Sequence, residues 1–162
     1  MFSRFCLFAI FAFAIFSTSA FAQKPVTFHA KFVANVSELH VSIPSDLIEP
    51  TIKGHYPYLA DRSLSQAEVN LYLEMYLRET VKLQYGAFPM ALGESGISHQ
   101  NGETKLVMNL AGLPAEAKEL MVQINSFTQH PNQQNLFKIT KSFYKQSFAL
   151  SNANAFSTHV PL

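Results

Sequence analysis

Histidine is the residue type in this chain best suited to chemistry, because neutral imidazole is a common ligand for transition metals. The 162 residues include six histidines. His55, His99 and His130 lie in predicted loops or beside predicted turns, where they could converge on a nickel, copper or zinc ion. No two of the six stand at H-x-H or H-x-x-x-H spacing, so no local chelate is formed. We therefore expect no cofactor and no specific metal site, and metal binding by these three residues is the alternative.

Two further histidines lie in the first predicted hairpin. Segments 26–34 and 39–43 alternate apolar and polar residues, which predicts two half-buried strands with His29 and His40 on their polar face. A turn that pairs Asn35 with Glu38 would place His40 opposite Val33, four residues along the strand from His29. Four residues of strand span about 13 Å, too far for two imidazoles to share one ion. The pair is therefore not predicted to be a site.

An aromatic loop is the second candidate for binding. Residues 51–63 show no periodicity and contain the succession Gly54-His55-Tyr56-Pro57-Tyr58. Long irregular connections often carry binding residues, so His55, Tyr56 and Tyr58 form a candidate binding loop. The alternative is that both tyrosine rings pack over the edge of the folded domain.

Catalytic motifs are weak in this chain. Gly93-Glu94-Ser95-Gly96 is close to the G-x-S-x-G nucleophile elbow, but its second glycine comes one residue early and no helix is predicted after it. Ser98 and His99 are sequence neighbours, which point to opposite faces of a strand. The one cysteine, Cys6, precedes residue 22 and leaves no thiol nucleophile beyond it. We therefore expect a non-enzymatic protein, with a small hydrolase as the least favoured alternative.

The N-terminal segment predicts export. Arg4 precedes an apolar run over residues 6–16 and an A-x-A motif that ends at Ala22, the pattern of a secretory signal peptide over residues 1–22. The apolar run is shorter than the ~20 residues of a membrane-spanning helix. We expect cleavage between Ala22 and Gln23, no stable membrane anchor afterwards, and a periplasmic or secreted location.

The charge balance restricts the class of partner. Cleavage would remove 22 of the 162 residues and leave 140, enough for one domain with a core. Without Arg4, 11 Lys and Arg side chains balance 11 Asp and Glu side chains. Nucleic-acid binders and polybasic membrane-surface proteins need clustered positive charge. Neutrality therefore predicts no nucleic-acid partner and argues against a polybasic membrane-surface protein.

Two local signals after the aromatic loop are strong. Ser65 followed by Glu68 forms a capping box, and apolar residues recur at helical spacing after it, which predicts one amphipathic helix at about residues 66–80. Asn101-Gly102 lies between two alternating segments and predicts a tight hairpin turn.

The remaining segments predict the fold class. They form, with the first hairpin, about seven short strands separated by turn residues at intervals typical of sandwiches. We predict a mainly β, single-domain antiparallel β-sandwich of Ig-like type over residues 23–150, with the helix at one end or edge. Residues 151–162 are polar and are predicted to be a loose C-terminal tail.

The order of these elements resembles that of a known family. The predicted strand pair ends in IPSDL (Ile43–Leu47), the helix region reads LYLEMYLRETVKLQYG (Leu71–Gly86), and a late segment reads INSFTQHPNQQNLFKI (Ile124–Ile139). In this layout the chain resembles the soluble periplasmic domain of HupE/UreJ-type proteins and related small exported bacterial proteins of unknown function. The resemblance implies a periplasmic sandwich domain linked to nickel or cobalt handling through membrane relatives. Gln23-Lys24-Pro25 stands where such proteins often carry histidines, so no site residue is carried over.

These observations favour an exported, non-enzymatic binding or accessory domain, with a link to metal handling at the cell envelope. The expected partner is a membrane or periplasmic protein. An envelope protein with an interaction or structural role, using a sheet edge or the aromatic loop as its docking surface, is the main alternative.

The signal peptide makes a direct prediction about the mature protein. Because Ala20 and Ala22 suit the peptidase, the exported chain should begin at Gln23, with its N-terminal glutamine cyclised. Intact mass spectrometry of the exported protein measures this, and a mass that retains the Phe-rich segment would instead favour a membrane anchor.

Overall fold

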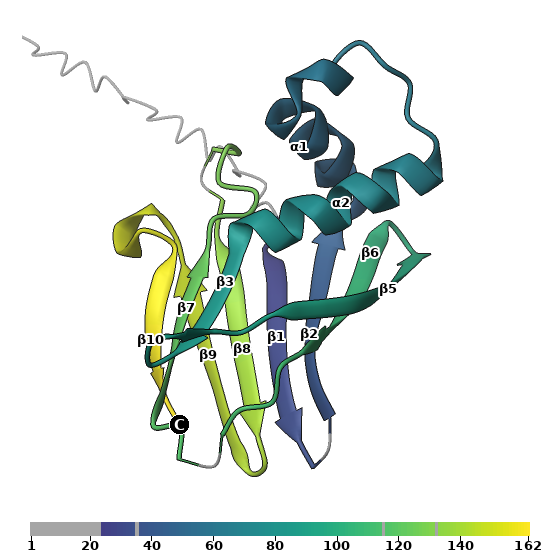
Figure 1. Cartoon of the computed structure of the whole chain (residues 1–162). Coiled ribbons are helices and arrows are strands. Elements are labelled where there is room, and N and C mark those ends of the chain that lie inside the picture. Colours follow the sequence, from purple (N-terminus) through teal and green to yellow (C-terminus); the bar gives the residue numbers. More distant parts are fainter. Residues whose placement is uncertain (1–23, 35, 115, 132) are drawn as a thin grey trace, which may run out of the picture.

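The strands of this protein form two sheets (Figure 1). The computed structural model describes residues 24–34, 36–114, 116–131 and 133–162, so the predicted cleavage site at Ala22 and Gln23 lies outside the described residues. The larger sheet has the order β5-β6-β2-β1-β8-β9, and the smaller sheet has the order β10-β7-β3-β4. The larger sheet consists of β1 (Val26–Val33), β2 (Val36–Pro44), β5 (Leu92–Gln100), β6 (Glu103–Leu110), β8 (Asn135–Lys141) and β9 (Tyr144–Leu150). The smaller sheet consists of β3 (Val81–Tyr85), β4 (Phe88–Pro89), β7 (Glu119–Ile124) and β10 (Ser157–Pro161).

The inner faces of both sheets contribute to one apolar core. Strand β1 buries every second side chain, as its alternation predicts, and β7 does the same from the smaller sheet. Phe28 and Phe137 of the larger sheet and Leu83 and Val122 of the smaller sheet belong to the same buried cluster. The prediction of a mainly β fold is confirmed, and the two sheets are compatible with a β-sandwich. The described residues form ten strands rather than about seven, and β1 and β8 pair in parallel while the other pairs are antiparallel.

Helix α2 (Gln66–Thr80) begins where the capping box predicts. The Glu68 N–H donates to Ser65 Oγ at 3.3 Å, and the Ser65 N–H donates to Glu68 Oε2 at 2.9 Å. The helix crosses one end of the sandwich (Figure 1) and buries Leu73, Tyr76 and Leu77. Its amphipathic pattern therefore reflects packing on the end of the sandwich.

A second helix, α1 (Ile48–His55), follows a short 3-10 helix at Ser45–Leu47 and packs against α2. The sequence predicts only one helix, because a proline normally breaks a helical pattern. Pro50 is the third residue of α1, and the N–H groups of the first turn have no partner within a helix. The missing N–H of Pro50 therefore costs α1 no hydrogen bond.

The prediction of a loose tail over residues 151–162 is wrong. Strand β10 pairs antiparallel with β7, with Val160 opposite Leu120, and the Leu162 N–H donates to the Lys118 carbonyl oxygen at 2.8 Å. Phe156 and Val160 are both buried. A polar segment with two apolar anchors is thus held by a backbone ladder that its composition does not reveal.

The turn at Asn101-Gly102 joins β5 and β6, with φ values of 53° and 72°. Positive φ at both positions is what a type I′ hairpin turn needs, so this prediction is confirmed. The Gly93–Gly96 segment lies within strand β5, where the register shifts between Leu92 and Ser95. It therefore does not form the strand-to-helix elbow that a nucleophilic serine would need.

In the part of the chain that the structure describes, no helix is both long and apolar enough to cross a membrane.

The capping box gives a test of the α2 boundary. Replacing Ser65 with alanine removes the acceptor for the Glu68 N–H and should lower the free energy of unfolding by about 1 kcal/mol. Denaturant melts measure the loss. The control is Ser63→Ala, at a nearby exposed serine outside the helix, which should leave the free energy of unfolding almost unchanged. Equal values for the two variants would contradict this assignment of the cap.

Candidate functional site

His55 is paired with a carboxylate. It is the last residue of α1, and its Nε2 atom lies 2.7 Å from Glu79 Oε2 on α2. Its ring makes edge-to-face contacts with Tyr56 and Tyr76, with centroids 4.7 Å and 4.9 Å away. His55 therefore belongs to the packing of α1 on α2.

His99 and His130 contact different partners. The Nδ1 atom of His99, on β5, lies 2.9 Å from Thr104 Oγ1, and its Nε2 atom lies 3.0 Å from Asn70 Oδ1 on α2. The Nε2 atom of His130 lies 2.8 Å from Thr51 Oγ1 on α1. Both imidazoles link the strands and loops of the sandwich to its helices.

Two of the three sequence-predicted metal candidates are held far apart. Asn70 and Glu79, which contact His99 and His55, are about 13 Å apart along the axis of α2 at the usual helical rise. Within the described ranges, no group of three or more His, Cys, Asp and Glu side chains is placed to hold a metal ion. His55, His99 and His130 are therefore not brought together as one metal centre.

The two tyrosines of the candidate loop lie in different environments. Tyr56 is buried, and its hydroxyl donates to Glu79 Oε1 at 3.2 Å. Burial and the Glu79 carboxylate raise the pKa of Tyr56 above its ordinary value. Tyr58 is exposed, with its ring centroid 6.2 Å from that of Tyr72. One ring thus packs between the helices while the other faces solvent.

The register of β1 and β2 places His29 directly opposite His40. The structure pairs Val33 with Val36, and Ala34 adopts a φ of 50°, the left-handed conformation that a tight hairpin turn requires. Opposed residues on one face of a sheet have Cβ atoms about 4.5–5.5 Å apart. The separation predicted from sequence, with His40 opposite Val33, is therefore wrong, because the turn lies two residues earlier in the chain than the predicted one.

A pocket surrounds these two histidines on the outer face of the larger sheet. It has a volume of about 360 Å³, and four strands contribute polar side chains to it. These are the hydroxyl, imidazole and ammonium side chains of Thr27, His29, Lys31, His40, Ser42, Ser98 and Lys105. None of the described residues that line this pocket is acidic. We call it the sheet-face pocket.

Neighbouring side chains orient the two imidazoles. His40 Nε2 lies 2.7 Å from Glu38 Oε2, and His29 Nε2 lies 2.9 Å from Thr140 Oγ1. Glu38 also stands opposite Lys31 in the β1–β2 ladder. Glu38 is thus engaged by His40 and faces a lysine. A second carboxylate, that of Glu103, lies next to the pocket, where it contacts Ser42 and Lys24 and lies close to Lys105.

The electrostatic surroundings of His29 favour its neutral form. Partial burial lowers the pKa of His29 below 6.5, and the positive charge of Lys31, His40, Lys138 and Lys145 lowers it further. These groups come from β1, β2, β8 and β9. Burial is the larger cause of the lowered pKa, and the positive charge of these neighbours adds to it.

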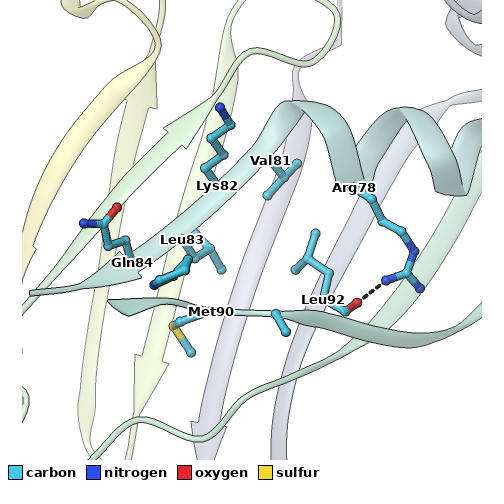
Figure 2. A pocket seen from close by; sticks show the side chains of 9 residues that line it. Arg78, Val81, Lys82, Leu83, Gln84, Met90 and Leu92 are labelled. Atoms are coloured by element: carbon cyan, nitrogen blue, oxygen red, sulfur yellow. Dashed lines mark hydrogen bonds between the residues drawn. The ribbon is translucent and has the colours of Figure 1, made fainter. Parts of the chain in front are cut away.

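A second pocket lies between β3 and the segment that leads into β5 (Figure 2). Its volume is also about 360 Å³, and its apolar lining residues are Val81, Leu83, Pro89, Met90, Ala91 and Leu92. Arg78 stands at its edge, where its guanidinium donates to the carbonyl oxygens of Leu92 and Gly93 and pairs with Glu74 at 2.6 Å. These contacts fasten α2 to β5, so we assign Arg78 a structural role.

A scan against protein-family models gives no match for this chain, and a search of the curated proteins gives none either. The resemblance to HupE/UreJ-type proteins therefore stays a prediction, and the sheet-face pocket is interpreted from its own residues.

The lowered pKa of His29 predicts how stability depends on pH. Unfolded chains titrate this histidine near 6.5, whereas the folded protein resists its protonation. The contribution of His29 is therefore fully present above pH 6.5 and is lost as the pH falls towards the folded-state pKa.

Replacing His29 with asparagine should make the fall in unfolding free energy below pH 6.5 shallower, as measured by denaturant melts over a pH series. His159→Asn, at an exposed histidine of β10, is the control for losing an imidazole elsewhere. The pKa values of Glu68, Glu74 and Glu103 are lowered from 4.5, so these carboxylates change stability at more acidic pH than His29 does just below pH 6.5. Parallel curves for His29→Asn and the unmodified protein would contradict the prediction.

Proposed function

We propose that this chain is an exported, non-catalytic binding domain whose ligand is a small organic anion held in the sheet-face pocket. The observation that carries the proposal is the direct pairing of His29 with His40 between Lys31 and Lys105. Lysine, imidazole and hydroxyl groups all donate hydrogen bonds to carboxylates and phosphates. The volume of about 360 Å³ suits a small molecule.

The positions of the two lysines indicate a ligand with two anionic groups. On β1, Lys31 lies four residues beyond Thr27. Across the sheet, Thr27 of β1 stands opposite Ser42 of β2, and Ser42 stands opposite Lys105 of β6. Lys105 is therefore two strands away from β1, level with Thr27. Strand geometry separates their backbones by about 13 Å along the strands and about 10 Å across them. His29 and His40 lie between the lysines, so a dicarboxylate or a diphosphate would contact a cation at each end.

The same charges disfavour a divalent cation. Lys31, Lys138 and Lys145 are close enough to lower the pKa of His29, and they would repel a metal ion at the histidine pair. His55, His99 and His130 are engaged by separate neighbours. Handling of nickel, copper or zinc, which the sequence and the resemblance suggest, therefore has weaker support than anion binding.

Titration calorimetry with pyrophosphate and succinate tests this proposal, with inorganic phosphate as a single-group comparison. Both two-group probes should bind at one saturable site and more tightly than phosphate. Lys105→Gln should weaken their binding about fivefold, the effect of losing ~1 kcal/mol from a partly exposed ion pair. Lys82→Gln, at an exposed strand lysine of the smaller sheet, is the matched control and should leave affinity unchanged.

The affinity for these anions should also rise as the pH falls through the pKa of His29, because the protonated imidazole attracts them. Equal effects of Lys105→Gln and Lys82→Gln, or no saturable binding, would overturn the proposal. One saturable site for nickel, copper or zinc at micromolar affinity or tighter, abolished by His29→Asn, would replace the anion with a metal.

A further inference from the structure

Two hairpins of the larger sheet end side by side, at the end of the sandwich away from α2 (Figure 1). β1 and β8 are neighbouring parallel strands with Phe32 level with Lys141, and the Ser142 N–H donates to the Phe32 carbonyl oxygen at 3.3 Å. The β1–β2 and β8–β9 turns thus belong to one surface. We call it the hairpin pole and define it as residues 31–34, 36 and 141–145.

The hairpin pole exposes three large apolar side chains. Phe143 is fully exposed at 103%, and Val33 and Val36 are 41% and 46% exposed. The β8–β9 turn places its positive φ of 54° at Ser142, and tight hairpin turns favour small or polar residues. Turn geometry therefore gives no reason for a phenylalanine at position 143. A group of exposed apolar residues at one place marks an interaction site.

Lysines lie close in sequence to these apolar side chains. Lys31, Lys141 and Lys145 belong to the pole, and none of its described residues is acidic. The nearest carboxylate on β2, Glu38, is engaged by His40. Although the mature chain is predicted to be formally neutral, a neutral total does not rule out a local basic surface.

We propose that the hairpin pole is a reversible membrane-contact surface that inserts Phe143, Val33 and Val36 into the headgroup region of an anionic lipid bilayer. The apolar side chains would enter the boundary between headgroups and acyl chains, and the three lysines would contact anionic headgroups. This inference goes beyond the proposed anion-binding function and uses a different set of contacts.

The shape of the pole favours a lipid surface as the occupant over a folded protein. Phe143 lies in the two-residue turn at the tip of the β8–β9 hairpin, where its side chain is fully exposed. Protein partners usually bury such anchors in matching pockets on closely packed surfaces. A fluid bilayer accepts a protruding ring without shape complementarity, and the flanking lysines select anionic lipids.

Tryptophan fluorescence tests the proposal, because the chain contains no tryptophan of its own. The Phe143→Trp variant should show a blue-shifted emission with phosphatidylcholine vesicles that contain phosphatidylglycerol, and little change with phosphatidylcholine alone. The matched control is Phe88→Trp, at a phenylalanine that is 63% exposed on β4, outside the hairpin pole. Its emission should stay unchanged with both kinds of vesicle.

Vesicle co-sedimentation measures the strength of binding independently. Phe143→Ser should lower partitioning onto anionic vesicles by about tenfold to a hundredfold, the range expected for withdrawing one phenylalanine from an apolar environment. The double variant Lys141→Gln and Lys145→Gln should weaken binding, and added salt should do the same. Phe88→Ser and Lys82→Gln should bind like the unmodified protein.

Unchanged Phe143→Trp emission, equal binding to neutral and anionic vesicles, or normal binding by Phe143→Ser would each overturn the proposal. Denaturant melts of the variants confirm that each one is folded before binding is compared. Lys105→Gln separates the two proposals, because it should weaken pyrophosphate binding and leave vesicle binding intact. Failure of one proposal is thereby distinguishable from failure of the other.

Discussion

The register of strand β1 is the constraint on which both proposed surfaces depend. β1 lies inside the larger sheet, paired antiparallel with β2 and parallel with β8, so it sets which side chains meet across three strands. In this register His29 stands between His40 and Lys138, and Phe32 lies level with Lys141. A shift of two residues would keep every side chain on its own face but would separate the two histidines. The pocket and the hairpin pole would both lose their present composition.

The β1–β2 hairpin also shows how far the sequence could predict the candidate site. Alternation correctly predicts that His29 and His40 share the polar face, because side chains in a strand have a period of two. It does not determine which residues face each other, and a turn placed two residues too late in the sequence displaced the predicted pairing by four residues. A displacement by an even number of residues keeps each side chain on the same face of the sheet, so the alternation is compatible with either pairing. Alanine rarely adopts a positive φ, so Ala34 gave no sequence signal for the position of the turn.

Features that depend on a few neighbouring residues were predicted correctly elsewhere in the chain, whereas pairings between distant segments were not predicted. The Ser65 cap of α2 and the Asn101-Gly102 turn are decided within a few residues, and the structure confirms both. Strand β10 is polar and becomes a strand only because β7, distant in the chain, offers it a partner. The parallel pairing of β1 with β8 and the polar lining of the sheet-face pocket from four strands likewise depend on the tertiary arrangement. No window of sequence contains that information.

The distance between the sheet-face pocket and the hairpin pole determines whether the two proposed surfaces can work together. An anionic bilayer at the hairpin pole would repel an anionic ligand, but salt screens this repulsion with a Debye length of about 8 Å under physiological conditions. His29 lies four residues from Val33, about 13 Å along the strand, and Lys105 lies farther still from the pole. Lys31 belongs to both surfaces, and Lys145 of the hairpin pole is close enough to His29 to lower its pKa. An anion at the histidine pair and a membrane at the hairpin pole are therefore compatible, with Lys31 and Lys145 as the points of competition between them.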